Sequence, residues 1–140
     1  MPKASQLSAE AVKLFQEPQL AHFVTVMPDG SPQVTPVWVD VADDGSEILI
    51  NTAEGRTKAR NTEQNAEVAV SVVDKHNDFR WVTVRGTVAD RRHEGANEHI
   101  DKLAKKYLGL DIYPNHRPDE QRVIIAIKPH NVVEQVGEAH

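Results

Sequence analysis

Residues 20–52 read LAHFVTVMPDGSPQVTPVWVDVADDGSEILINT, which is three runs rich in β-branched residues separated by two short turns. The first turn contains Asp29-Gly30 and the second contains Asp44-Gly45. Asp-Gly between alternating apolar runs is a strong local signal for a hairpin, because glycine readily adopts the positive φ that tight turns require. This stretch therefore predicts an antiparallel meander of three strands.

Two residues within the strands carry positional information. Pro36 cannot donate a hydrogen bond to a neighbouring strand, so it belongs on a sheet edge or at a bulge. Gly86 interrupts the alternating run WVTVRGTV and indicates a bulge or a close backbone approach.

The rest of the chain adds helices and further strands around this meander. Ser8 is a plausible N-cap for a helix that ends by Pro18, and Thr57 is the expected cap of a short helix over residues 58–65. The last long helix ends at Gly109. Strands are predicted over 67–74 and 81–91, with a polar connection over 75–80 between them. A helix follows over 93–109, and its apolar stripe includes Tyr107 and Leu108. A loop over 110–120 leads to a last strand over 121–136, which is bent at Pro129.

Short turn-linked strands dominate this order, and there are too few β-α-β crossovers for a doubly wound sheet. The sequence therefore predicts a mainly β fold, a small closed or nearly closed antiparallel barrel with peripheral helices. With 140 residues and no linker-like segment, residues 1–140 are expected to form a single domain.

Composition excludes several classes of function. Zero cysteines remove disulfides, thiolate catalysis and cysteine-ligated metal sites. The seven histidines lack the spacing of a zinc enzyme, so no metal site is expected. A net charge of -5 and an aromatic content of 5% argue against nucleic-acid binding. Apolar runs are too short to cross a bilayer and no secretory signal is recognisable, so no membrane association and a cytoplasmic location are expected.

Residues 51–61, NTAEGRTKARN, place Arg56, Lys58 and Arg60 where a strand gives way to a helix. A helix N-terminus already carries partial positive charge, so acidic residues are the usual stabilising choice there. Two interpretations remain open. The bases are solvated surface charges, or Arg56 and Lys58 converge with the Thr57 hydroxyl and the helix N–H groups on one phosphate or carboxylate.

Six segments occur in an order and at separations that together are specific, although each is degenerate alone. They are TVMPDGSPQVTPVWVD, ILINTAEGRTKARN, VAVSVVD, FRWVTVRGTV, the helix around HIDKLAKKYLG, and RVIIAIKPHNV. In these segments, which span nearly the whole chain, the protein resembles the split β-barrel flavin and deazaflavin oxidoreductases related to pyridoxamine 5′-phosphate oxidase. The similarity is greatest to their small F420-dependent branch.

This resemblance implies a homodimer with two cofactor sites at the subunit interface, each lined by both chains. It implies that Arg56 and Lys58 hold the cofactor phosphate with help from Thr57. The other implied contacts are Gln33, Thr35, Pro36 and Val37 beside the ring, Ile50, Asn51 and Thr52 near the ring and ribityl chain, and Arg80 and Trp81 from the partner subunit.

The implied function is an F420-dependent oxidoreductase that transfers a hydride from the reduced deazaflavin to a conjugated or heteroaromatic small molecule. Two alternatives stay open: an FMN-dependent split-barrel oxidoreductase or oxidase, and a non-catalytic F420 carrier. No residue of the chain is identifiable as catalytic, because no acid–base pair is evident. Trp38 and Trp81 are expected to serve packing or an interface rather than ring stacking. The loop that carries Tyr113, His116 and Arg117 either flanks the substrate opening or is a simple connection.

Overall fold

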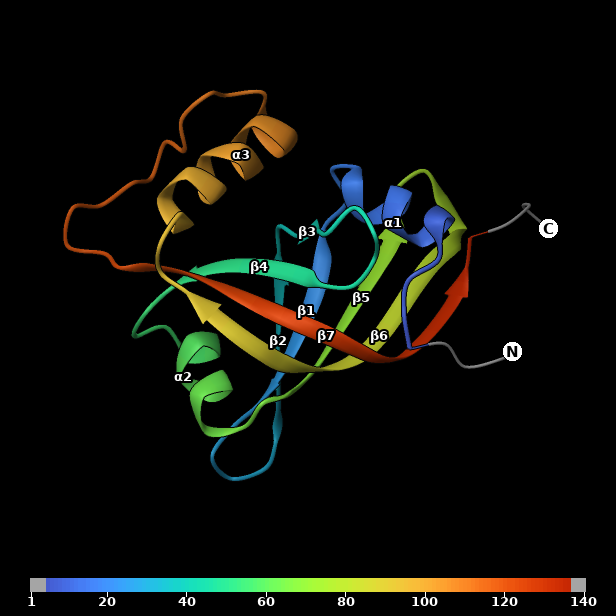
Figure 1. Cartoon of the computed structure of the whole chain (residues 1–140), viewed down its shortest axis with the longest axis horizontal. Coiled ribbons are helices and arrows are strands. Elements are labelled where there is room, and N and C mark those ends of the chain that lie inside the picture. The colour runs from blue at the N-terminus through green and yellow to red at the C-terminus, as the bar shows by residue number, and fades with distance from the viewer. Residues whose placement is uncertain (1–4, 137–140) are drawn as a thin grey trace.

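Seven antiparallel strands form one sheet in the order β2-β1-β5-β6-β7-β4-β3, and three helices lie around it (Figure 1). The structure is a computed structural model and describes residues 5–136. The elements are α1 (Ala9–Gln16), β1 (Ala21–Val26), β2 (Pro32–Val37), β3 (Asp40–Val41), β4 (Ile48–Ala53), α2 (Thr57–Gln64), β5 (Glu67–Asp74), β6 (Asn77–Arg92), α3 (Ala96–Leu108) and β7 (Arg122–Gln135).

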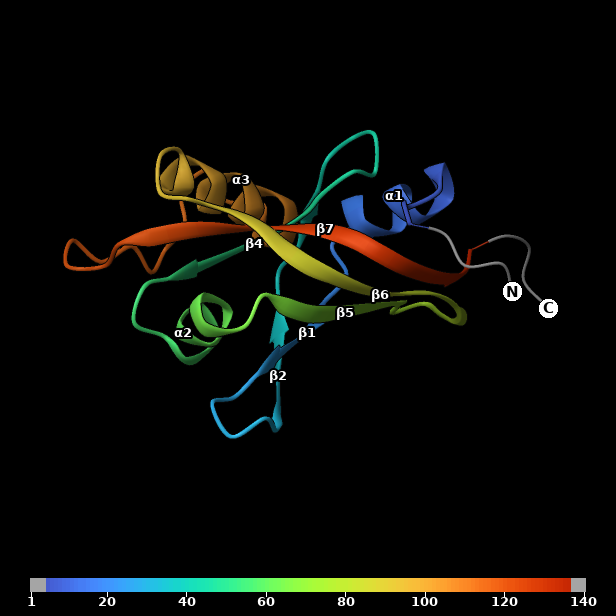
Figure 2. The ribbon, with the colours of Figure 1, turned by 60° about the horizontal axis from the view of Figure 1, so that its bottom comes forward.

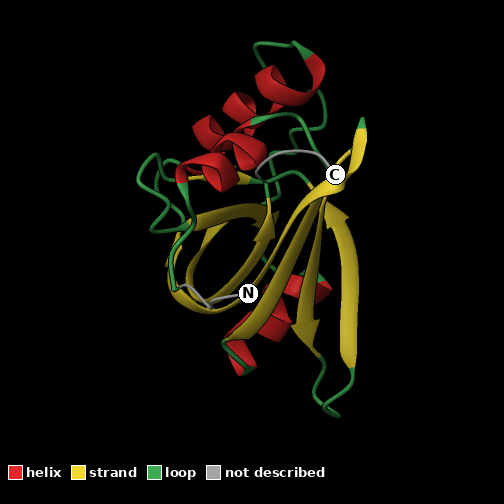
Figure 3. Cartoon of the chain, turned by 90° about the vertical axis from the view of Figure 1, so that its right-hand side faces the viewer, coloured by secondary structure: helices red, strands yellow, loops and turns green. Residues whose placement is uncertain are grey.

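The connectivity of the edge strands forces the sheet to curl. β2 and β3 lie at opposite edges, yet only Trp38 and Val39 separate them in the chain. A flat sheet of seven strands would put its edges about 29 Å apart, at roughly 4.8 Å per strand. Three residue steps reach only about 10 Å. The sheet therefore rolls up until its edges approach, as Figure 3 shows, and the predicted mainly β barrel is confirmed.

Both predictions about special strand residues are confirmed. β2, which contains Pro36, is an edge strand that pairs only with β1. The pairing of β6 with β7 shifts register between Arg85 and Gly86. A Cβ at Gly86 would lie 2.6 Å from the Lys128 carbonyl oxygen, so the bulge brings two backbones too close for any side chain.

The concave face of the sheet holds the hydrophobic core, which α1 closes. The predicted cap is confirmed, since the Ser8 hydroxyl accepts a hydrogen bond from the Ala11 N–H at 3.1 Å. Leu14 and Phe15 on this helix are fully buried. Figure 2 shows α1 and α3 on one side of the long strands and α2 on the other. Within residues 5–136 no helix is long and apolar enough to cross a membrane.

Three local predictions are wrong. Arg56 rather than Thr57 occupies the N-cap position of α2, and no side chain caps that helix. The expected connection over 75–80 is mostly strand, because β6 begins at Asn77 and only Lys75 and His76 form the turn. Leu108 is 49% exposed, although its spacing places it near the apolar stripe of α3.

Candidate functional site

A cleft of about 410 Å³ opens between the β2 edge, the start of α2 and the helix α3. Its lining combines apolar and cationic side chains and contains no acidic residue. The lining residues are Leu20, Pro36, Val37, Trp38, Asn51, Arg56, Lys58, Ile100, Leu108, Tyr113, Asn115 and Arg122.

The cationic part of the cleft consists of Arg56, Lys58 and Arg122. Burial lowers the pKa of Lys58, and the positive charges of Arg56 and Arg122 lower it further. No carboxylate acts in the opposite direction on Lys58 among the described residues. This part of the cleft is therefore short of negative charge.

Glu120 supplies the carboxylate nearest to the two arginines. Its Oε2 atom lies 2.8 Å from Nη2 of Arg56, and its Oε1 atom lies 2.9 Å from Nη2 of Arg122. The second contact is an ion pair without hydrogen-bond alignment, because Nη2 and Nε of buried Arg122 have no hydrogen-bond acceptor in the described part of the chain. One carboxylate thus offsets only part of three positive charges.

Arg122 is a site residue that sequence reasoning missed. It begins β7, and the pairing of that strand with β4 sets Ala53 against Arg122 and Asn51 against Ile124. Its Nη1 donates to Oδ1 of Asn51 at 3.2 Å, and its guanidinium lies 5.0 Å from the centre of the Tyr113 ring. The available signal was an arginine at the head of an otherwise apolar strand, RVIIAI.

Aromatic side chains form another wall of the cleft. The Trp38 ring stacks on Tyr107 at 5.1 Å between centroids, and Tyr113 meets Trp38 edge-on at 5.9 Å. The Tyr107 hydroxyl donates to the Gln19 carbonyl at 2.6 Å and accepts from the Val39 N–H at 3.1 Å. Tyr107 is thus a half-buried packing residue that holds the Trp38 ring in place. Trp38 itself lines the cleft.

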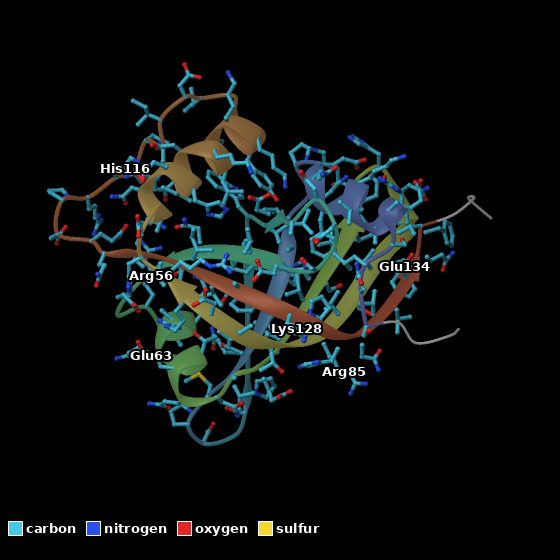
Figure 4. All side chains as sticks on the ribbon, in the orientation of Figure 1. Arg56, Glu63, Arg85, His116, Lys128 and Glu134 are labelled. Atoms are coloured by element: carbon cyan, nitrogen blue, oxygen red, sulfur yellow. The ribbon has the colours of Figure 1, made fainter. Side chains whose placement is uncertain are left out.

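The loop after α3 contributes a second, adjoining cleft of about 590 Å³. It shares Arg56, Tyr113 and Asn115 with the first cleft and adds His116 and Arg117. Asp101 holds this loop on α3, since its Oδ1 atom lies 2.7 Å from the Tyr113 N–H nitrogen and 2.7 Å from Nε2 of His116. Figure 4 shows Arg56 and His116 on the side of the molecule that carries α3. This loop borders the opening rather than merely connecting two elements.

The other predicted site residues divide into two groups. Pro36, Val37 and Asn51 line the cleft together with Arg56 and Lys58. The remaining residues lie outside that lining, and their contacts with a cofactor stay predictions. Gln33 and Thr35 are half-buried on β2, Ile50 is in the core, Thr52 is buried with an unpartnered hydroxyl, and Thr57 is exposed at the start of α2.

Arg80 and Trp81 are not brought to the cleft of their own chain. Arg80 forms ion pairs with Glu17 and Asp74 at 2.8 and 2.9 Å. Both carboxylates already offset its charge, so Arg80 has little left to offer an anion. Trp81 is half-buried on β6. Their predicted role across a subunit interface stays a prediction.

The curled sheet with its edge cleft defines the chain as a split-barrel protein. It belongs to the pyridoxamine 5′-phosphate oxidase family, whose model matches residues 7–135.

Two relatives within reach of sequence comparison are reductases named for F420. The chain is 27% identical over 130 residues to the F420H(2)-dependent biliverdin reductase of Mycobacterium tuberculosis (strain CDC 1551 / Oshkosh), covering 92% of this chain and 88% of that one. A solved structure described as an F420 reductase is 33% identical, with a TM-score of 0.75 over 86% of this chain and 94% of the other. The predicted resemblance to the F420-dependent branch is thereby confirmed.

An FMN-binding protein from Syntrophomonas wolfei subsp. wolfei shares the fold alone. It is 14% identical, with a TM-score of 0.67 over 94% of this chain and 86% of that one.

Proposed function

We propose that the protein is an F420-dependent oxidoreductase that binds its cofactor in the cleft beside β2. The observation that carries the proposal is a lining with three cations, no acidic residue and an aromatic wall. Such a lining suits a ligand with a flat ring at one end and a phosphate at the other. The similarity to two F420-dependent reductases supports F420 as that ligand.

The residues fit the phosphate of such a cofactor. Lys58 has no carboxylate partner, Nε of Arg122 has no acceptor and its Nη2 has only the ion pair with Glu120, so the site offers more donors than the described residues accept. The N–H groups at the start of α2 lack a side-chain cap and add to this donor set. Arg56, Lys58 and Arg122 would hold the phosphate, and Thr57 at the first position of α2 would assist.

Pro36, Val37 and Trp38 would lie against the ring, and Asn51 would supply a polar contact. When bound, reduced F420 supplies the hydride, so the chain needs no redox residue of its own. The apolar wall of Leu20, Ile100 and Leu108 would exclude water from the ring and leave room for a flat, conjugated or heteroaromatic substrate.

The alternative cofactor is FMN. The family description and the fold shared with an FMN-binding protein support it, and three cations around one point would satisfy its single phosphate. Arg117 in the adjoining cleft favours F420, because the glutamate tail of F420 carries further negative charge.

We also infer that two copies associate through the outer face of the sheet. Val34, Val24 and Ala69 lie side by side across β2, β1 and β5 on this face. Val34 is 54% exposed and Val73, further along β5, is 40% exposed. The face is hollowed by a cleft of about 400 Å³ whose only ionisable lining residues within the described chain are His22 and Arg85. Exposed apolar surface of this extent is typical of an interface.

The position of Pro36 supports a shared site. Pro36 lines the cofactor cleft and also pairs with His22, which lines the hollow on the outer face. A second copy on the outer face would therefore border the cofactor cleft, as the family resemblance implies.

Turnover tests the proposal. The protein should bind F420. With reduced F420 and a conjugated or heteroaromatic acceptor, it should then catalyse oxidation of the cofactor, which is measured as the return of the absorbance of oxidised F420. Tight binding of F420 without turnover, across a panel of such acceptors, would instead support the non-catalytic carrier.

A further inference from the structure

A chain of buried polar side chains runs from β3 to the cationic part of the cleft. Oδ2 of Asp40 lies 3.0 Å from Nε2 of His99 on α3, and Nδ1 of His99 lies 3.1 Å from Nδ2 of Asn51 on β4. Oδ1 of Asn51 then accepts from Nη1 of Arg122 at 3.2 Å. Four separate elements thus contribute one residue each to a continuous path.

The neighbours of Asn51 fix the direction of every hydrogen bond in this chain. Nδ2 of Asn51 also donates to the Ala96 carbonyl at 2.8 Å, and its Oδ1 faces a guanidinium that can only donate. The amide therefore has one allowed orientation. Nδ1 of His99 must accept from Asn51, so Nε2 of His99 carries the hydrogen and donates to Asp40.

Burial makes this arrangement rigid. The side chains of Asp40, His99 and Arg122 are 11%, 8% and 4% exposed. Lys102 is the only other charged side chain within salt-bridge distance of Asp40 in residues 5–136, at 3.3 Å, and it is 70% exposed. Lys106 is more distant and donates to the Phe15 and Val39 carbonyls at 2.5 and 2.6 Å. Asp40 and His99 do not line the cleft, so they can reach an anion only through Asn51 and Arg122.

We propose that Asp40 and His99 are positioning residues for the anion site: the Nδ1 atom of His99, held by Asp40, orients the Asn51 amide, and Asn51 holds the guanidinium of Arg122 toward the cleft. The aromatic face of Tyr113 supports that guanidinium independently of Asn51, at 5.0 Å. Without the His99 contact only the Ala96 carbonyl holds the NH₂ group of Asn51, so the position of its Oδ1 toward Arg122 is less firmly fixed. This inference rests on the proposed role of the cleft in binding the F420 phosphate.

Two substitutions of His99 separate positioning from simple packing. In His99→Asn the side-chain oxygen can replace Nδ1, so the contact with Asn51 is kept. In His99→Gln the amide reaches the place of Nε2, so the contact with Asp40 is kept and the one with Asn51 is lost. Both variants leave a buried amide, which makes them matched controls for each other.

The test is to titrate each variant with oxidised F420 and to follow binding by fluorescence. The variants are His99→Asn, His99→Gln, Arg122→Gln and the double variant His99→Gln/Arg122→Gln. We expect His99→Gln to weaken binding about fivefold, the equivalent of one neutral hydrogen bond. His99→Asn should stay within about twofold of the unmodified protein. The double variant should bind no more weakly than Arg122→Gln alone, because His99 acts through Arg122.

Three outcomes would overturn the inference. Equal losses in His99→Gln and His99→Asn would mean that His99 only fills space. If the double variant loses the sum of the affinities lost by the two single variants, His99 acts elsewhere. Either of these two outcomes would leave the anion site itself in place. Unchanged binding by Arg122→Gln would remove Arg122 from the anion site and the positioning inference with it. Should His99→Gln not fold, Asp40→Asn weakens the hold on Nε2 of His99 without changing the cleft lining, and it must show the same non-additivity with Arg122→Gln.

Discussion

At the scale of the residue, Lys58 distinguishes a binding site from a charged surface. It lines the cleft, is half-buried and has two arginines nearby that lower its pKa. Replacing Lys58 by alanine should weaken F420 binding by about 1.5–3 kcal/mol, roughly 10- to 150-fold, because a charged hydrogen bond to the phosphate is lost. Fluorescence titration measures this change.

Arg60 provides the matched control for Lys58. It lies two residues further along α2, carries the same charge, is exposed and does not line the cleft. Arg60→Ala should leave the affinity for F420 almost unchanged. Equal effects of the two substitutions would mean that only the general charge of the helix matters.

The three bases of residues 51–61 differ in where the structure places them, since Arg56 and Lys58 line the cleft and Arg60 does not. Arg56 and Lys58 were predictable as neighbours because they are two residues apart in the sequence, and both line the cleft. Arg122 was not predictable in this way, since it approaches them only through the register between β4 and β7. Local spacing contains no information about such a long-range pairing.

At the scale of the element, Asp40 fastens α3 to the sheet. Burial alone would raise the pKa of Asp40, but hydrogen bonds from His99 and the Val41 N–H, together with the charge of Lys102, lower it to about 2. Because the folded value lies below the unfolded value of 3.8, Asp40 contributes stability above pH 4. That contribution disappears as the pH falls from about 4 toward 2.

Asp40→Asn should therefore lower the free energy of unfolding by roughly 2 kcal/mol at pH 6, because folding lowers the pKa of Asp40 from 3.8 to about 2. The difference from the unmodified protein should shrink steadily between pH 4 and pH 2. Urea unfolding at several pH values measures it, with exposed Asp43→Asn as the control for losing one carboxylate. A difference that is constant with pH would contradict this account of Asp40.

Most elements could be predicted from the sequence, and the errors have a common physical cause. The first residues of β6 were read as a loop because they are polar, and Phe79 there is 60% exposed. This end of the β5–β6 hairpin extends beyond the core, so hydrophobic alternation is lost while strand pairing continues. Similarly, Leu108 follows the helical period of the apolar stripe but is exposed in the cleft, because that period cannot reveal where the core ends and the cleft begins.

At the scale of the whole molecule, closure of the sheet brings the β2 edge to the start of α2 and places the outer face beside the cleft. The sequence of the meander, with Pro36, predicts the edge strand, whereas the surface proposed to meet a second copy depends on the complete curl of the sheet. The exposed valines of that face lead to a direct test of the dimer.

Val34→Lys should convert the proposed dimer to a monomer, because a charge within an apolar interface cannot be desolvated at low cost. Sedimentation equilibrium measures the mass, and F420 binding should weaken in parallel if the partner completes the site. Ile112→Lys is the control, since Ile112 is 67% exposed but lies on the loop after α3, away from the outer face. A Val34→Lys protein that stays dimeric would exclude this face as the interface.

We propose that the cationic cleft binds F420 in preference to FMN. Parallel fluorescence titrations of the purified protein with oxidised F420 and with FMN, at one ionic strength and pH, test it most directly. We predict a dissociation constant for F420 at least tenfold lower than that for FMN, with the preference reduced in Lys58→Ala. Tighter binding of FMN than of F420 would contradict the claim.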